Sequence, residues 1–258
     1  MKIHVLTLFP EIPRAFFGQS IMAKAVERGI LDCSLVNIRD FAFDRHKSCD
    51  DAVYGGGAGM LMLPEPLAAA LESVGVEPKT GTQSGRPGRR VIFPSPSGKP
   101  FTQADAVRLA GMDELVFLCG RYEGVDQRIL DLYVDEELSL GDFVGSSGEL
   151  AATVIVDAVY RLIPGVISAE SLEEESFSGG LLEYPQYTRP EIFRGRKVPE
   201  VLLSGHHENI RRWRLRKRVE KTLRVRPDLL RKSLEAGLYS EETRALIKEL
   251  ENGSDQDD

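Results

Sequence analysis

The chain contains little cysteine. Its 258 residues include three cysteines, Cys33, Cys49 and Cys119, which are far apart in the sequence and form no CxxC pair. An odd number of widely spaced cysteines argues against a disulfide framework and against a structural zinc site. We therefore expect a protein of a reducing compartment, the cytoplasm.

The sequence also lacks signals for export or for membrane insertion. The first ten residues, MKIHVLTLFP, are too short and too alternating for the hydrophobic region of a signal peptide. No apolar run approaches the roughly 20 residues that a membrane-spanning helix needs. We expect no membrane partner. With 42% hydrophobic residues, the chain is long enough for one large or two modest domains whose cores need no disulfides.

Two widespread nucleotide-binding signatures are missing as well. The chain has neither the GxGxxG spacing of dinucleotide-binding folds nor the GxxxxGK[ST] spacing of P-loops, so nucleotide hydrolysis is a weak hypothesis. What the chain does have is a regular alternation of strand-like and helix-like segments up to about residue 163. Such alternation predicts an α/β domain with a mainly parallel sheet.

The predicted elements follow from hydrophobic periodicity and from capping residues. Ser20 is the expected N-cap of the first long helix, and Thr102 with Asp105 resembles a capping box. Strands are expected at 2–8, 31–39, 90–96, 114–120 and 135–140, and helices at 21–29, 66–74, 102–112, 125–133 and 149–165.

Three loops that follow predicted strands are rich in Gly, Pro and Ser: FPSPSGKP, CGRYEGVD and LGDFVGSSGEL. Ligands of parallel sheets gather at the carboxyl ends of strands, and glycine lets a flat ligand touch main-chain groups without an intervening Cβ. Any one of these loops is better explained by ordinary turn chemistry. Three of them at strand ends favour a ligand site.

Two further segments interrupt the alternation. Residues 40–60 are polar and then glycine-rich, and they are too long for a routine connection, which indicates a functional or mobile loop. Residues 77–90, EPKTGTQSGRPGRR, have the composition of a disordered linker.

The C-terminal part of the chain is strongly basic, although the whole chain carries a net charge of −7. Residues 189–226 contain thirteen Arg and Lys and four Glu, a net +9, and the only tryptophan, Trp213, lies in the densest run. This pattern is the electrostatic footprint of nucleic-acid binding. A solvated helix face is the alternative, but such faces usually carry interleaved acids, and here Glu208 and Glu220 only flank the run.

Several long motifs, in order along the whole chain, resemble the bacterial tRNA (guanine-N1)-methyltransferases of the SPOUT superfamily. These motifs are LFPE from Leu8, RDF and DRH between Arg39 and His46, YGGGAGM, CGRYEGVD, GDFV, RLIPGV, SFSGGLLEYPQYTRP and VLLSGHHENIRRWRLRK.

The resemblance implies the architecture. It implies a trefoil-knotted α/β domain over residues 1–163 that binds S-adenosylmethionine, a flexible linker over 164–188, and a small, basic, all-α domain over 189–258 that grips the anticodon arm of tRNA. It also implies a homodimer with active sites between the subunits. Magnesium is a possible cofactor of the family. His206 and His207 have no carboxylate at ligand spacing, so we predict no metal site from them.

The resemblance also implies the roles of individual residues in methylating N1 of the guanosine 3′ of the anticodon. Glu175 stands where the family has its general base, an aspartate, and Arg161 matches the arginine that stabilises charge on the guanine O6. The implied donor-binding residues are Ser95, Pro96, Gly120, Tyr122, Glu123, Gly124, Leu140, Gly141, Asp142, Phe143, Val144, Gly145, Ser146 and Gly148.

The implied tRNA contacts lie in both halves of the chain. Asp44, Arg45 and His46 are equally well explained as a local hydrogen-bonded turn. The other expected contacts are Gly59, Arg189, Arg211, Arg212, Arg214 and Lys217.

The chain departs from the family pattern at ligand loops. Residues 145–149 read Gly-Ser-Ser-Gly-Glu instead of Leu-Ser-Gly-Gly-Glu, residues 94–98 and 126–128 also differ, and Glu175 is longer than aspartate. If position 147 needs a positive φ, Ser147 strains the donor loop. A tRNA-binding relative with weakened or lost catalysis is therefore the alternative function.

Overall fold

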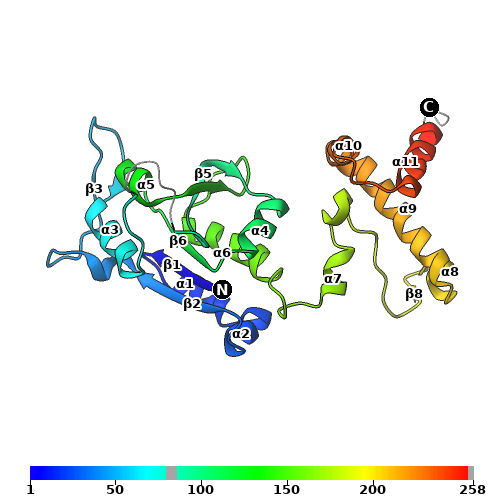
Figure 1. Ribbon diagram of the computed structural model, residues 1–258, viewed down its shortest axis with the longest axis horizontal. Coiled ribbons are helices and arrows are strands. Elements are labelled where there is room, and N and C mark those ends of the chain that lie inside the picture. The colour runs from blue at the N-terminus through cyan, green and yellow to red at the C-terminus, as the bar shows by residue number, and fades with distance from the viewer. Residues whose placement is uncertain (80–85, 255–258) are drawn as a thin grey trace. The chain divides into compact units, whose positions relative to one another are not determined.

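The computed structural model describes residues 1–79 and 86–254, so part of the predicted 77–90 linker and the end of the acidic tail lie outside the described residues. The chain forms two compact units, Met1–Ile167 and Ser168–Asp258 (Figure 1). Each unit has buried hydrophobic residues of its own.

A five-stranded parallel sheet forms the centre of the first unit, which confirms the predicted α/β class. In spatial order its strands are β2 (Asp32–Asn37), β1 (Lys2–Thr7), β6 (Glu114–Leu118), β5 (Arg89–Pro100) and β7 (Glu136–Ser139). Two of the inner strands, β1 and β6, are largely apolar and buried, as expected when both faces of a parallel sheet are covered.

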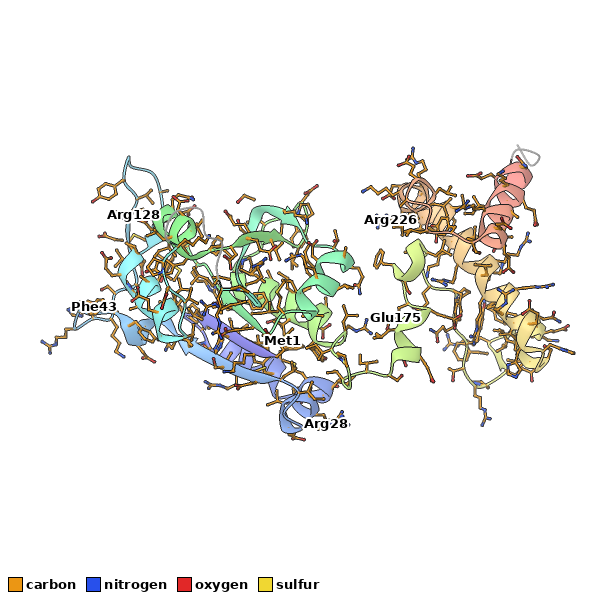
Figure 2. The ribbon with its side chains drawn as sticks, in the orientation of Figure 1. Met1, Arg28, Phe43, Arg128, Glu175 and Arg226 are labelled. Carbon is orange, nitrogen blue, oxygen red and sulfur yellow. The ribbon has the colours of Figure 1, made fainter. Side chains whose placement is uncertain are left out.

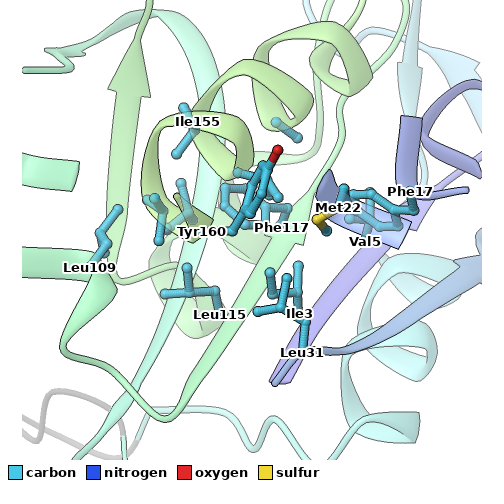
Figure 3. Close-up of a cluster of buried hydrophobic side chains, with 14 of the residues drawn as sticks. Ile3, Val5, Phe17, Met22, Leu31, Leu109, Leu115, Phe117, Ile155 and Tyr160 are labelled. Carbon is cyan, nitrogen blue, oxygen red and sulfur yellow. The ribbon is translucent and has the colours of Figure 1, made fainter. Parts of the chain in front are cut away.

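Side chains alternate along each strand, so apolar residues lie on both faces of this sheet, and helices cover both faces. Leu115 and Phe117 of β6 belong to one buried cluster (Figure 3), and Val116 and Leu118 belong to another. The first cluster includes residues of α1 (Glu11–Phe17), α2 (Ser20–Glu27), α4 (Gln103–Ala110) and α6 (Gly148–Tyr160), and the second includes residues of α3 (Pro64–Ser73) and α5 (Gln127–Tyr133).

The local predictions were partly right. The capping box of Thr102 and Asp105 is confirmed. The N-cap of α2 is Gln19, so the prediction of Ser20 as the cap was wrong by one residue. The 40–60 segment contains structure that was not predicted, namely the one-turn helix η1 (Ile38–Phe41) at its start and an antiparallel pair of strands, β3 (Asp50–Ala52) and β4 (Met60–Met62).

The second unit is mainly helical and contains one hairpin that was not predicted. Its small core consists of Leu181, Val219, Leu230, Tyr239 and Ile247, with further leucines packed around it. Its elements are α7 (Ala169–Glu173), η2 (Ser178–Gly180), β8 (Ile192–Phe193), β9 (Arg196–Lys197), α8 (Glu200–Leu203), α9 (His207–Val225), α10 (Pro227–Glu235) and α11 (Glu241–Ser254).

Part of the segment expected as a linker packs against these helices. The Tyr239 hydroxyl donates to the Gly180 carbonyl at 2.7 Å, and the Leu182 amide donates to Thr222 Oγ1 at 2.9 Å. The structure thus groups the segment after Ile167 with the second unit. The flexibility of residues 164–188 and the trefoil knot stay predictions. Among the described helices, none combines the length and the apolar character needed to cross a bilayer.

Candidate active site

A cavity of about 570 Å³ lies where β5, β6 and β7 end, and all three predicted Gly-rich loops line it. This volume is within the usual range for small-molecule sites. Gly141 and Asp142 are not among its lining residues. The predicted donor-binding residues that line it are Ser95, Pro96, Gly120, Tyr122, Glu123, Gly124, Leu140, Phe143, Val144, Gly145, Ser146 and Gly148.

Close backbone approach explains two of the glycines. A Cβ on Gly148 would lie 3.0 Å from Cys119 Cα and from the Gly120 nitrogen, and a Cβ on Gly120 would lie 2.8 Å from the Phe93 ring. The Gly148 amide also donates to the Gly120 carbonyl at 3.2 Å. The N-terminus of α6 is therefore held directly against the end of β6.

An excursion in β5 forms another wall of the cavity. Leu138 of β7 pairs with both Pro94 and Lys99, so residues 95–98 leave the sheet and return to it. A Cβ on Gly98 would lie 2.6 Å from the backbone of Glu137 and Leu138. Only glycine allows this return to pass so close to β7.

Two departures from the family pattern, Ser147 and Gly145, do not strain the donor loop. Ser147 has φ −167° and ψ 150°, an extended conformation at the N-cap of α6. The condition for strain at Ser147 is therefore not met, because no positive φ is needed there. Gly145 stands in open space, with no atom within 4 Å of an added Cβ.

A buried carboxylate lies directly behind the cavity lining. Glu149 is fully buried, accepts a hydrogen bond from Thr7 Oγ1 at 2.5 Å, and forms an ion pair with Arg121 Nε at 3.2 Å. The Arg121 guanidinium also lies 4.3 Å from the centre of the Phe9 ring. Sequence reasoning missed this network, because its three polar residues come from distant segments. It connects β1, the 120–124 loop and α6.

The β3–β4 segment contacts the same 120–124 loop. Gly59 has φ +97°, and a Cβ there would lie 2.5 Å from Glu123 Cγ, while the Glu123 amide donates to the Met60 carbonyl at 3.0 Å. Tyr122 itself has φ 58°; burial and a hydrogen bond with Asp50 raise the pKa of its hydroxyl. Gly59, expected as a tRNA contact, thus packs beside the cavity lining.

The Asp44–His46 stretch is a hydrogen-bonded turn. Asp44 accepts from the amides of His46 at 3.1 Å and of Ser48 at 2.7 Å, and these bonds, that of Ser48 most strongly, lower the pKa of its carboxyl. The neighbouring Phe43 projects from this loop (Figure 2) and is 83% exposed. A tRNA contact by Asp44, Arg45 and His46 stays a prediction.

The two proposed catalytic residues belong to different units. Arg161 follows α6 as its C-cap in the first unit, and Glu175 follows α7 in the second (Figure 2). The adjacent Glu174 is engaged within the second unit, since it accepts from the Tyr184 hydroxyl at 2.9 Å and from Arg214 Nη1 at 3.1 Å.

Four arginines of α9 are paired with acids, contrary to the expectation of a run that acids only flank. Arg211 bonds both Glu208 of its own helix and Glu242 of α11, at 2.9 and 2.7 Å. Arg211 and Arg212 lower the pKa of Glu208 to about 2. The sequence could not reveal acids that come from other elements. The remaining pairs are Arg212–Glu208, Arg214–Glu174, Arg216–Glu220, Arg216–Glu249 and Lys217–Glu220.

No group of three or more His, Cys, Asp or Glu side chains within the described part of the chain is arranged to hold a metal ion. Magnesium stays a prediction from the family resemblance.

Comparison with known proteins identifies the family of this chain. A family model described as tRNA (Guanine-1)-methyltransferase TrmD matches residues 1–232. A tRNA (guanine-N(1)-)-methyltransferase of Treponema denticola is 66% identical over 98% of this chain and 100% of its own length. Its namesakes in Treponema pallidum and Borreliella burgdorferi are 55% and 56% identical, over 97% and 91% of this chain and 96% and 95% of their own lengths. The SPOUT-class resemblance read from the motifs is therefore confirmed, and the chain belongs to the tRNA (guanine-1)-methyltransferase TrmD family.

Proposed function

We propose that this protein methylates N1 of guanine in tRNA, at the guanosine 3′ of the anticodon, with S-adenosylmethionine as the methyl donor. The observation that carries the proposal is the bare-backbone cavity at the ends of three parallel strands, in a chain that is 66% identical to a tRNA (guanine-N(1)-)-methyltransferase. A cytoplasmic location, where tRNA is modified, belongs to the same proposal.

The cavity residues fit the donor. Gly120, Gly124, Gly145 and Gly148 line the cavity without a side chain, and main-chain N–H and C=O groups at such positions can read the edges of an adenine. Gly120 and Gly148 leave no space for a Cβ, so the backbone itself forms the wall. When bound, S-adenosylmethionine supplies an electrophilic methyl group on its sulfonium.

Glu175 is the proposed general base. Guanine N1 carries a proton at neutral pH, and that proton must leave as N1 attacks the methyl carbon. The Glu175 carboxylate accepts it, and Arg161 stabilises the negative charge that develops on O6. Glu174 is the nearest alternative base, and its carboxylate accepts hydrogen bonds from Tyr184 and Arg214.

The second unit is proposed to hold the anticodon arm. Arg211 and Arg212 can exchange their shared partner Glu208 for phosphates, because these pairs are exposed and exposed pairs contribute little stability. The proposed contacts are Arg189, Arg211, Arg212, Arg214 and Lys217.

The protein is proposed to act as a homodimer with its active sites between subunits, since a C2 pair is the commonest closed assembly. Light scattering should give twice the 28.6 kDa of one chain. Mixing a Glu175→Ala subunit with an Arg161→Ala subunit should restore activity if the two residues of one site come from different chains. A monomer at micromolar concentration contradicts this part of the proposal.

A methyl-transfer assay tests the whole proposal. Transcripts carrying guanosine at the target position should accept a methyl group, and those carrying adenosine should not. The alternative is a tRNA-binding relative that has lost catalysis. Calorimetric titration with S-adenosylmethionine distinguishes it from an active enzyme, because such a relative would bind tRNA but would not bind the donor. The extended backbone of Ser147 removes one of the reasons for that alternative.

A further inference from the structure

The β8–β9 hairpin of the second unit is short, exposed and apolar at two positions. Phe193 pairs with Arg196, and Ile192 pairs with Lys197. Phe193 is 61% exposed and Ile192 is 52% exposed, so the hairpin buries neither side chain fully. A surface hairpin without a core of its own is only marginally stable unless something packs on it.

The turn of this hairpin is also unusual. Its two central residues, Arg194 and Gly195, have φ values of 50° and 79°, as a type I′ turn requires. Asparagine and aspartate are the common residues at the first position, because they tolerate a positive φ better than other residues that carry a Cβ. The chain thus holds an arginine at the tip of the hairpin at a conformational cost.

The cations of the hairpin differ from those of α9. Arg194, Arg196 and Lys197 form no ion pair with any acid in residues 1–79 and 86–254, whereas the α9 cations Arg211 and Arg212 share Glu208. The nearest acid in the sequence, Glu191, makes a backbone bond to Val198 across the base of the hairpin. Three positive charges therefore remain available to an external anion.

The aromatic ring lies beside two of these cations, Arg194 and Arg196. Arg194 Cζ is 5.3 Å from the centre of the Phe193 ring. Arg196 is the cross-strand partner of Phe193 and projects from the same face of the hairpin as that ring. An exposed ring flanked by guanidinium groups is the arrangement with which proteins stack an unpaired base and neutralise its phosphates.

We propose that the β8–β9 hairpin is an RNA contact: Phe193 stacks on an unpaired nucleotide of the tRNA, and Arg194, Arg196 and Lys197 contact the adjoining phosphates. Charge complementarity favours RNA as the occupant, since the three cations have no acid partner within the described part of the chain and the chain as a whole is acidic. The inference rests on the proposed function, because it takes tRNA as the substrate.

Salt-dependent tRNA binding tests the charges. The variant Arg194→Asn/Arg196→Gln/Lys197→Gln should lower the slope of log affinity against log salt by about 0.7 to 0.9 for each phosphate that the protein no longer neutralises. Asparagine at 194 suits the turn, so the hairpin is expected to remain folded. The matched control, Arg231→Gln/Lys232→Gln/Lys248→Gln, removes the same charge from exposed positions of α10 and α11 and should leave the slope within about 0.5 of wild type.

Two substitutions test the ring. Phe193→Ala should weaken tRNA binding about 5- to 150-fold, the usual range for removal of one base stack, without changing the salt slope. Phe193→Trp should bind as the wild type does, because it preserves a stacking surface. A Phe193→Leu variant that binds tRNA as tightly as wild type would overturn the stacking role.

The same preparations separate the two proposals. If the wild-type protein methylates tRNA while the triple charge variant and Phe193→Ala both bind tRNA normally, only the hairpin inference is overturned. Wild-type protein that binds no tRNA would overturn both. If the charge variant changes the oligomeric state in sedimentation but not the tRNA affinity, the hairpin contacts a second copy of the chain and the RNA assignment is wrong.

Discussion

The two units of this chain depend on different kinds of interaction. The first has two apolar cores on either side of a parallel sheet, and its cavity is lined largely by backbone that glycine leaves uncovered. The second has a small core, and its longest helix carries several ion pairs at its surface. The difference shows that close main-chain packing shapes the first unit, whereas surface charge is prominent in the second.

The largest expected effect is on the rate of methylation. Glu175→Gln should lower the methylation rate about 10²- to 10⁴-fold, the usual loss on removing a general base, while donor and tRNA binding persist. Single-turnover methylation with saturating ligands measures this effect. Glu174→Gln is the matched control and should lose less than about tenfold; the opposite ranking would make Glu174 the base.

Glu175→Asp sharpens the same test. A faster aspartate variant would mean that the extra methylene of glutamate misplaces the carboxylate, since about 1 Å of misplacement costs on the order of 100-fold. A slower variant would mean that the site is adjusted to glutamate.

The buried network behind the cavity should dominate the stability of the first unit. Glu149→Ala leaves Arg121 without its buried partner, and breaking such a pair costs about 3 to 5 kcal/mol of unfolding free energy. Urea denaturation measures the loss, and Glu149→Gln, which keeps an acceptor for Thr7, should recover part of it. A loss below about 1 kcal/mol for Glu149→Ala would show that the network does not support the unit.

Two glycines test whether backbone approach shapes the cavity. Gly98→Ala forces a Cβ to within 2.6 Å of β7 and should cost about 1 to 3 kcal/mol of stability together with donor affinity. Gly145→Ala adds the same methyl group in open space and should leave both nearly unchanged. Calorimetry with S-adenosylmethionine compares the two, and equal losses would contradict the geometric explanation.

A buried capping carboxylate predicts a pH effect in the first unit. Burial alone raises the pKa of Asp105, but hydrogen bonds from Thr102, Lys99 and Arg108 outweigh it and lower the pKa to about 2. Because the pKa of an unfolded aspartate is about 3.9, this contribution is complete above about pH 4 and is lost as the pH falls towards 2.

The corresponding variant is Asp105→Ala. It should be roughly 2 kcal/mol less stable than wild type at pH 7, a difference set by the pKa shift. The difference should shrink towards zero near pH 2. Denaturant titrations of both proteins at several pH values measure it, and a difference that is independent of pH would contradict the linkage.

The smallest expected effect concerns the paired cations of the second unit. Neutralising Arg212, Arg214 and Lys217 should lower the slope of log tRNA affinity against log salt. Three lost phosphate contacts would lower it by about 0.7 to 0.9 each. We expect a smaller change, because the glutamate partners of these cations compete with phosphate. An unchanged slope would remove α9 from the tRNA surface. A reduction equal to three full phosphates would mean that the glutamates do not compete.

The sequence predicted those parts of the molecule that depend on local pattern. The parallel sheet, the Thr102–Asp105 capping box and the gathering of three Gly-rich loops all follow from periodicity and from strand-end geometry. The pairing of Glu149 with Thr7 and Arg121 does not, because it joins residues that only the fold brings together.

The structure differs from the sequence interpretation at two places for a similar reason. The expectation for Ser147 rests on the residue that relatives carry, whereas strain depends on the backbone angle, which is extended. The expectation for the α9 run rests on its neighbours in the sequence, whereas Glu242 and Glu249 come from α11. In both cases the deciding quantity is absent from the local sequence.

The burial of the cysteines has a consequence for chemical labelling. All three thiols are free; burial raises the pKa of Cys33 to about 11 and that of Cys119 well above its ordinary value. Alkylating reagents attack thiolates, so Cys119 is unreactive at neutral pH while β6 and the N-terminus of α6 stay in contact. The rate at which a reagent modifies Cys119 therefore reports how often the wall of the cavity opens, without any introduced label.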